Sequence, residues 1–301
     1  MGFRLYNVGA ASSLLLHDLR VKRDVSVAFL TDLHLSPGEA AAGPRYREAV
    51  DWWDRFFDRP AGLVERLLDE ITRVGVELVV WGGDNLDFFD TDTAAMLRNL
   101  CTERHLKAYF LPGNHDWESP DARFRAHDVD ARERDSNMAA LAEVWHMGPP
   151  IEVVEAAGIR LLLLHMRYRN DSGVHAVVEE PVAVRLHELL QDGVPTLIFY
   201  HYPFALPAVE HRLRAVWRGA LPCAQFEDND AVVRLIGNCP DVLATFCGHA
   251  HINSEDPFSE KGPWQFATGA GVDGVWRLVR VSADAAPKSL RVAGIPSVRD
   301  A

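Results

Sequence analysis

The chain has 301 residues, of which 48% are hydrophobic and 25% are charged, and its formal net charge is −12 at pH 7. These values suit one large globular domain with a full core, and no shift in composition marks a second domain. The acidic charge disfavours a nucleic acid as a general partner, because proteins that bind nucleic acids usually carry a basic stripe. The apolar run Leu14–Leu16 is too short to span a membrane, and the first residues show no signal-peptide pattern. We therefore expect a soluble protein.

The cysteines favour a reducing compartment. Their spacing contains no metal-binding pair, and Cys247 lies in a predicted buried strand, so we interpret all four as reduced core thiols. They are Cys101, Cys223, Cys239 and Cys247. On this basis we expect a cytoplasmic protein.

The N-terminal residues predict two strands. Phe3–Val8 and Ser13–Val21 are rich in apolar and β-branched residues, and a Gly-Ala-Ala-Ser turn joins them. We expect this pair to extend a sheet.

Five short apolar runs further along the chain are typical of the buried strands of an α/β protein. Stretches typical of helices, such as residues 61–75, separate them. Because the carboxyl ends of such strands meet at one edge of a sheet, we expect the residues that follow the runs to converge. The runs are Val25–Thr31, Leu78–Trp81, Ala108–Leu111, Leu197–Tyr200 and Val242–Phe246.

A polar segment follows each of these runs. The segments offer aspartate, asparagine and histidine but no cysteine, which favours zinc, iron or manganese over a closed structural zinc site. They hold enough ligands for two metal ions, and two ions about 3.5–4 Å apart can clamp the oxygens of a displacement at phosphorus. Asp84 is our candidate for a bridging carboxylate, because it is central in chain order and follows two glycines that permit close backbone approach. The segments are Asp32–His34, Gly83–Asp87, Gly113–Asp116, His201 and Gly248–His251.

Two more strands are predicted near the C-terminus. Trp264–Thr268 and Val275–Val281 have strand composition, and the glycine-rich Gly269–Gly274 joins them. We expect a hairpin near the polar segments. Beyond Pro287 the pattern fades, and we expect residues 287–301 to form a tail that is partly disordered.

The polar segments together spell D-x-H, G-D-x-x-D, G-N-H-D, H and G-H-x-H. This pattern resembles that of the calcineurin-like metallophosphoesterases in every element, from about Val25 to His251. The resemblance implies an α/β four-layer sandwich, in which two mixed β-sheets lie face to face between flanking helices, with a binuclear metal site at the C-terminal ends of the strands. We accordingly expect residues 1–286 to form a single domain of this family.

The resemblance also implies which residues hold the two metal ions, whose identity stays open among manganese, iron and zinc. The first ion would be held by Asp32, His34, Asp84 and His251, and the second by Asp84, Asn114, His201 and His249.

Two residues beside these ligands are implied to be catalytic. Our hypothesis is that a hydroxide bridging the metals attacks phosphorus in line and that His115 protonates the leaving alkoxide. Asp87 matches the family carboxylate that orients the catalytic histidine, although it can also be read as an ordinary loop carboxylate. His165 follows the apolar run Leu161–Leu164 and lies outside the motifs, so we expect it to have a structural or substrate-rim role.

Three insertions near the site should decide the substrate: residues 37–60, 117–147 and 204–226. The first holds several aromatic side chains among arginines, which could stack a nucleobase and hold a phosphate. The same aromatics could instead form a helix face packed on the sheet, or a homodimer contact. They are Tyr46, Trp52, Trp53, Phe56 and Phe57.

Three functions stay open at this point. The pattern favours a phosphodiesterase that acts on a small-molecule phosphate ester, such as a nucleotide, and it is most similar to the bacterial cyclic-nucleotide phosphodiesterase-like branch. One alternative is hydrolysis of a pyrophosphate linkage in a nucleotide-sugar or lipid precursor. The other is a non-catalytic scaffold of the same fold.

Overall fold

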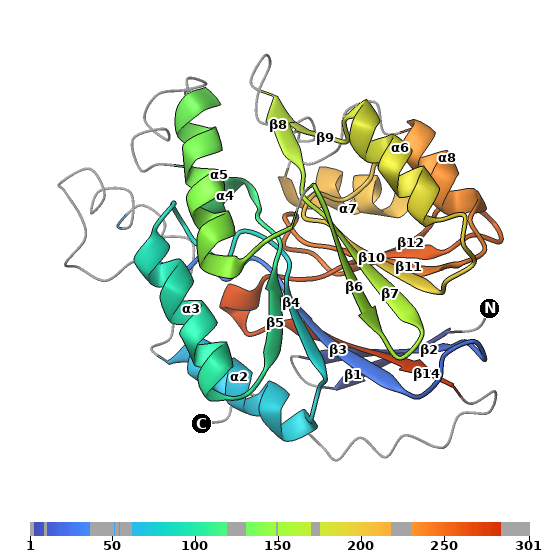
Figure 1. Cartoon of the computed structure of the whole chain (residues 1–301), viewed down its shortest axis with the longest axis horizontal. Helices are drawn as coiled ribbons and strands as arrows, with labels where there is room; N and C mark the ends of the chain where they lie inside the picture. The colour runs from blue at the N-terminus through green and yellow to red at the C-terminus, as the bar shows by residue number, and fades with distance from the viewer. Residues whose placement is uncertain are drawn as a thin grey trace.

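Two six-stranded sheets pack face to face in the computed structural model (Figure 1). The structure describes residues 3–8, 11–36, 51, 54, 62–118, 131–148, 150–169, 175–217 and 230–283. Apolar side chains from both sheets fill the space between them, and aromatic rings line it. The Phe29 ring of the first sheet lies 5.5 Å from that of Phe199 in the second, and Phe199 stacks on Phe246 at 5.0 Å. This apolar interface holds the two sheets together.

The first sheet has the strand order β1-β2-β14-β3-β4-β5. Strands β3, β4 and β5, the last of which forms one edge of the sheet, run parallel, while β14 is antiparallel to β3. The predicted N-terminal pair is confirmed as an antiparallel ladder at the edge of this sheet, but its second strand begins at Ala11, within the predicted turn, and ends at His17 instead of Val21. The strands are β1 (Phe3–Val8), β2 (Ala11–His17), β3 (Val25–Leu30), β4 (Leu78–Trp81), β5 (Lys107–Phe110) and β14 (Trp276–Ser282).

The second sheet has the order β12-β13-β11-β10-β7-β6, and its four inner strands are parallel. The five predicted apolar runs are all strands, but three belong to the first sheet and two to the second. The expectation of one shared sheet edge is therefore wrong, because two edges meet instead. The strands are β6 (Ile151–Ala156), β7 (Ile159–Leu164), β10 (Thr196–Phe199), β11 (Val242–Cys247), β12 (Ser254–Pro257) and β13 (Trp264–Ala267), and β8 (Arg167–Arg169) and β9 (His175–Val177) form a separate ribbon.

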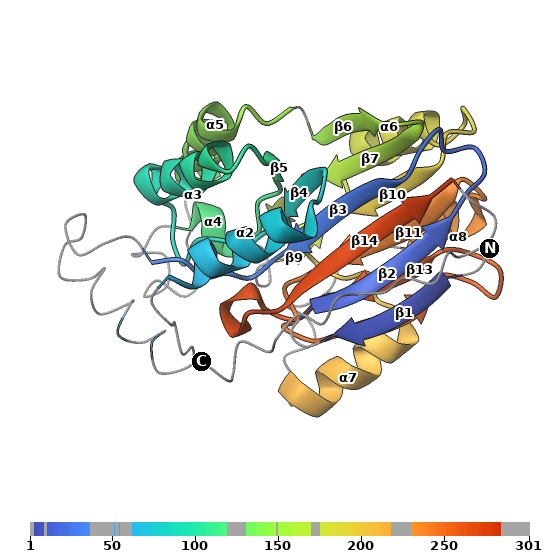
Figure 2. The same ribbon diagram turned by 90° about the horizontal axis from the view of Figure 1, so that it is seen from below.

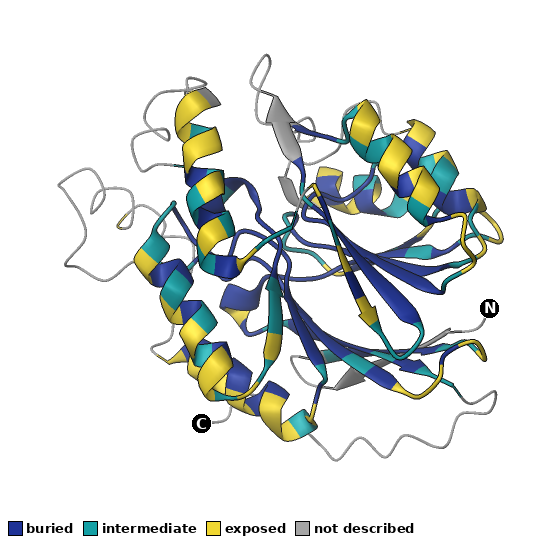
Figure 3. Ribbon diagram, viewed as in Figure 1, coloured by how far each residue is buried: buried dark blue, intermediate teal, exposed yellow. Residues whose placement is uncertain are grey.

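Helices cover the outer faces of both sheets, and turning the molecule shows the resulting layers (Figure 2). One apolar cluster joins α2, α3 and α5 to the outer face of the first sheet, and another joins α6, α7 and α8 to the second. Strands are largely buried, while helices expose one side (Figure 3). The helices are α2 (Leu63–Val74), α3 (Thr91–Glu103), α4 (Asn114–Trp117), α5 (Ala131–Trp145), α6 (Glu180–Leu189), α7 (Pro207–Trp217), α8 (Asp230–Asn238) and the 3₁₀ turn η4 (Gly271–Asp273).

The predicted C-terminal hairpin is wrong. Strand β13 pairs with β11 and β12, whereas β14 pairs with β2 and β3, so the glycine-rich connection crosses from the second sheet to the first. The backbone of this connection bonds to the end of the segment that follows β3, because the N–H groups of Gly271 and Val272 donate to the carbonyls of Thr31 and Asp32. Two strands with a glycine-rich link give the same sequence pattern whether they pair with each other or not.

Some of the predicted segments lie outside the residues that the structure describes. The aromatic side chains of residues 37–60 and the tail 287–301 lie outside the described residues, whereas the other two insertions contribute helices α5 and α7. Cys101 and Cys247 are buried free thiols, and the free thiol of Cys239 is half-buried. Cys223 lies outside the described residues. No helix among the described residues is long and apolar enough to cross a membrane.

Candidate metal centre

The five polar segments converge where the carboxyl ends of the two sheets meet. Asp32 and His34 follow β3 and Asp84 follows β4, whereas His201 follows β10 and the last two histidines follow β11. Six of the carboxylates and imidazoles of these segments form two groups, and in each group the donor atoms lie within 4.8 Å of one another. The groups are Asp32, His34 and His251, and Asp84, His201 and His249.

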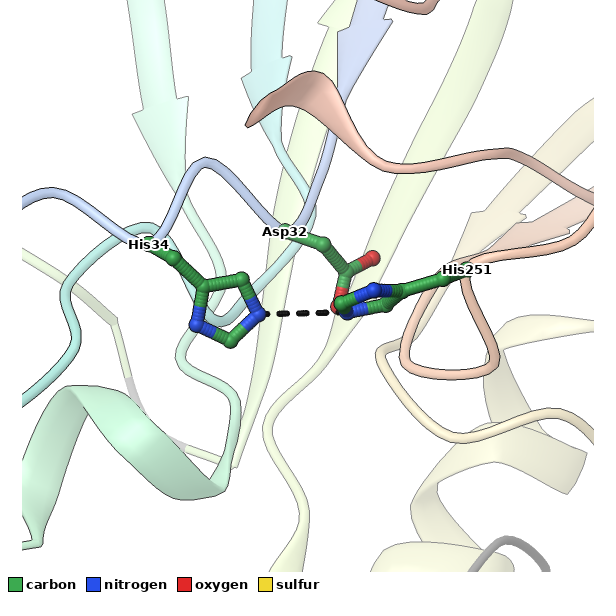
Figure 4. A group of neighbouring side chains, drawn as sticks. All are labelled: Asp32, His34 and His251. Carbon is green, nitrogen blue, oxygen red and sulfur yellow. Dashed lines mark hydrogen bonds and ion pairs between the residues drawn. The ribbon is translucent and has the colours of Figure 1, made fainter. Parts of the chain in front are cut away.

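The first group joins both sheets through three side chains (Figure 4). The Nε2 atoms of His34 and His251 are 3.1 Å apart, and His251 Nε2 lies 3.3 Å from Asp32 Oδ1. Two imidazole nitrogens and a carboxylate oxygen that face one point suit a divalent cation, because ligand atoms about 2.0–2.2 Å from one ion lie about this far apart.

The second group is built around Asp84. Its Oδ2 atom lies 3.0 Å from His201 Nε2 and 3.9 Å from His249 Nδ1, and its Oδ1 atom accepts a 2.8 Å hydrogen bond from the backbone N–H of His115. The ring nitrogen Nδ1 of His201 is 2.8 Å from the carbonyl of Gly82, to which it donates when Nε2 is left for a cation. Both groups therefore fit a metal ion of the kind that oxygen and imidazole ligands prefer.

Asn114 and Tyr202 extend the second group. The Tyr202 hydroxyl donates a 2.9 Å hydrogen bond to Asn114 Oδ1, and the Tyr202 ring stacks on His249 with centroids 3.8 Å apart. One side chain thus contacts two expected ligands of the second metal. No motif in the sequence gives Tyr202 a role, and its place directly after His201 is the only local signal of its position in the site.

The backbone is strained at the ligands. Eight described non-glycine residues have positive φ, and five of them are expected ligands: Asp32, His34, Asp84, His249 and His251. Each such residue costs about 1–3 kcal/mol and persists only where its surroundings enforce it, as happens at functional sites.

Glycines next to the ligands permit the close packing. A Cβ atom on Gly83 would clash with the His201 ring, and one on Gly248 would clash with the side chains of Thr31 and Asp32. Gly83 also has a φ of 97°, which side-chain-bearing residues rarely adopt. These contacts explain why glycine directly precedes Asp84 and His249 in the motifs.

Opposite charges shift the pKa values in the centre. Burial alone would raise the pKa of Asp84, but the charges of His201 and His115 outweigh it and lower that pKa well below its ordinary value. Burial alone would lower the pKa of His201, but the charge and hydrogen bond of Asp84 outweigh it and raise that pKa to about 9. Burial and then the charge of Asp84 raise the pKa of Asp116 to about 8. Asp84 is thus the electrostatic centre of the site.

The remaining carboxylates flank this centre. Asp87 lies 3.3 Å from Nδ1 of His34 and accepts a 2.5 Å hydrogen bond from Ser36, so it is paired with a ligand, and its expected role beside His115 remains a prediction. Glu118 lies 3.8 Å from Nδ1 of His115, whose ring is 5.1 Å from that of His34. Glu118 belongs to none of the motifs, although it follows Asp116 of the G-N-H-D segment by only two positions.

His165 does not join either group. It follows β7, which is separated from β11 by β10 in the second sheet. Its Nε2 atom lies 3.9 Å from Glu152 Oε2. This position supports the expectation that it lies outside the ligand set.

This fold and this pair of ligand groups define a binuclear metal hydrolase. A family model described as calcineurin-like phosphoesterase matches residues 25–253, and the chain belongs to that family. It is therefore a metal-dependent hydrolase of phosphoric esters with a site for two divalent metal ions.

Solved structures share the fold at low identity, whereas the comparison with curated proteins found no match. A dimetal phosphatase from Danio rerio is 14% identical with a TM-score of 0.53, and the match covers 82% of this chain and 88% of that one. The purple acid phosphatase PPD1 from seeds of yellow lupin (Lupinus luteus) is 12% identical with a TM-score of 0.52, and the match covers 86% of this chain and 47% of that one. At these identities the likeness supports the fold alone.

Proposed function

We propose that the protein is a phosphodiesterase. The observations that carry this proposal are the two ligand groups, one of them built around Asp84, and the His115 ring, which lies 5.1 Å from the ring of His34 in the first group. Such a centre combines sites for two cations with an imidazole that can deliver a proton to a departing oxygen.

The charge around the centre supports a diester over a monoester. Asp87 and Glu118 lie beside His34 and His115, in addition to the carboxylates that would hold the metals. A phosphodiester carries one negative charge, whereas a phosphomonoester carries close to two at neutral pH. The smaller charge is repelled less by these two carboxylates.

The proposed ligand roles follow the two groups. Asp32, His34 and His251 hold one metal ion, while His201, His249 and Asn114 hold the other, and Asp84 is shared between them. When bound, the ions lower the pKa of a coordinated water towards about 7 and stabilise charge on the phosphoryl oxygens. Candidates for the two ions are manganese, iron and zinc.

His115 is proposed as the general acid. Its side chain is 17% exposed, so it can reach a bound substrate, and the Glu118 carboxylate lies 3.8 Å from its Nδ1 atom. In this role His115 donates a proton to the leaving oxygen, an effect worth about 10²–10⁴-fold in rate. Asp87 positions His34 through the ring nitrogen that does not face His251, as carboxylates commonly do behind a metal-ligating histidine.

The test compares four substrates after reconstitution with manganese. Bis(p-nitrophenyl) phosphate, p-nitrophenyl phosphate, 3′,5′-cyclic AMP and a nucleoside diphosphate sugar are offered to the wild type and to Asp84→Asn. We expect turnover of the diesters in the wild type and its loss in the variant. Faster turnover of the monoester or of the diphosphate sugar would contradict the phosphodiesterase assignment, and equal activity of the variant would contradict the site.

A further inference from the structure

A pocket lies away from the ligand groups, between α5, the start of β6 and α6. Its volume is about 350 Å³, within the range of about 300–1,000 Å³ that is usual for small-molecule sites. Most of its lining is apolar, with Met138 and Ala142 from α5, Met147 beyond the end of α5, and Val182 from α6. Such a lining suits the apolar body of an organic ligand.

His165 supplies an unsatisfied polar group to this pocket. Its side chain is only 9% exposed, and its Nε2 atom has no hydrogen-bond partner among the described residues. Burial lowers the pKa of His165 to about 4, so the ring is neutral at pH 7. A buried polar atom without a partner costs about 1–3 kcal/mol, and a ligand that bonds to it would recover part of that cost.

Two carboxylates give the pocket its charge preference. Glu179 lines the same pocket, and the Glu152 carboxylate lies 3.9 Å from His165 Nε2. Carboxylates and a neutral imidazole nitrogen accept hydrogen bonds. They therefore favour a ligand that donates, and they disfavour an anion such as a phosphate or a fatty acid.

We propose that this pocket is a binding site for an aryl or alkyl amine, whose apolar body packs between the two methionines and Val182 and whose N–H group donates to His165. The site is separate from the metal centre and does not depend on the phosphodiesterase assignment. The pocket is also lined by α5, which contacts the helix that carries His115. Asn137 of α5 donates a 2.9 Å hydrogen bond to the carbonyl of Trp117 at the end of α4.

The test uses N-phenyl-1-naphthylamine, an apolar amine that fluoresces in apolar surroundings, on the manganese-loaded full chain. We expect saturable binding of one probe per chain. Ala142→Trp fills the pocket and should weaken binding at least tenfold, whereas Glu143→Trp adds the same side chain on an exposed position of α5 and should leave the Kd unchanged.

A second variant tests the hydrogen bond. His165→Leu should weaken the probe about fivefold to tenfold, which is the usual range for one hydrogen bond, and should leave its N-methylated analogue unaffected because that analogue has no N–H to donate. Thermal unfolding and hydrolysis of bis(p-nitrophenyl) phosphate check that each variant is folded. If Ala142→Trp is not folded, Ala139→Trp at the exposed rim of the pocket replaces it.

Three results would overturn the proposal. They are the absence of saturable binding to the wild type, an unchanged Kd in the folded pocket-filling variant, and an equal loss of both probes in His165→Leu. Loss of phosphodiesterase activity in Asp84→Asn has no bearing on it, since that variant should bind the probe as the wild type does.

Discussion

His201 and His165 occupy equivalent positions on neighbouring strands but have opposite properties. Strands β10 and β7 are parallel and pair Phe199 with Leu163, so each histidine lies two residues beyond this pair. His201 lies 3.0 Å from Asp84, and despite burial that carboxylate raises its pKa to about 9. The Glu152 carboxylate lies further from His165, at 3.9 Å from Nε2, and burial lowers the pKa of His165 to about 4. Burial at a strand end is therefore common to both, and the carboxylate at 3.0 Å from His201 accounts for the opposite shift of its pKa.

The carboxylate comes from the other sheet. Asp84 follows β4 of the first sheet, and it reaches His201 because β10 lies in the middle of the second sheet, where the two edges meet. Strand β7 lies one position further out, and its histidine faces α5 and α6 instead. The contrast between the metal centre and the His165 pocket thus depends on which strand lies opposite the other sheet.

The substitution Asp84→Asn tests the contrast between His201 and His165 most directly. The substitution removes the charge that distinguishes His201 from His165, so we expect fewer than two manganese ions per chain and a loss of diester hydrolysis of about 10³-fold. Metal analysis after gel filtration and steady-state kinetics measure the two effects. Asp230→Asn, at a residue whose side chain is 87% exposed, is the matched control and should bind two ions. Full metal content in Asp84→Asn would refute its sharing between the groups.

His115 is a third histidine, with a partner of its own in Glu118. We expect His115→Ala to reduce kcat by about 10²–10⁴-fold for an alkyl phosphodiester, and by much less for bis(p-nitrophenyl) phosphate, because nitrophenolate leaves without a proton. The ratio of the two kcat values is the measurement. His211→Ala, on the exposed side of α7, serves as the control. Equal losses for both substrates would exclude the general-acid role.

The pKa of His165 predicts an acid-dependent loss of stability. An unfolded histidine titrates near 6.5, so between about pH 6.5 and pH 4 the unfolded chain binds a proton that the folded chain does not. Stability therefore falls as the pH drops through this window, by up to about 3 kcal/mol from this group.

His165→Leu should abolish that contribution. Urea unfolding of the metal-free protein at pH 7 and pH 4.5 measures it, and the variant should lose less stability than the wild type between the two values. His187→Leu, at an exposed histidine of α6, should behave as the wild type does. An unchanged pH dependence in His165→Leu would show that His165 takes up its proton in the folded state.

The smallest expected effect comes from Tyr202→Phe. The change removes the hydroxyl that donates to Asn114 and keeps the ring that stacks on His249. We expect affinity for the more weakly bound manganese ion to fall about tenfold, which is typical for loss of a group that orients a ligand. Calorimetric titration with manganese measures it, with Tyr109→Phe on β5 as the control. Unchanged affinity would limit the role of Tyr202 to packing.

Much of the fold and the expected ligand set could be predicted from the sequence. The apolar runs are local patterns, and a buried strand needs little more than such a run between turns. Asp32, His34, Asp84, His201, His249 and His251 were recognisable because ligands at strand ends follow those runs directly, and these six form the two groups. Glycines such as Gly83 mark positions that only a residue without a side chain can occupy, so they too leave a local trace.

The tertiary structure alone decided which strands share a sheet and which side chains meet. It separated β13 from β14, paired Asp87 with His34, and brought Tyr202 to Asn114. The contact between His34 and His251 joins residues 217 positions apart in the chain. Such contacts follow from how two sheets and their helices pack, and the local pattern around either residue contains no information about its distant partner. The apolar run before His165 likewise does not distinguish it from His201, because the Asp84 carboxylate that raises the pKa of His201 follows a strand of the other sheet.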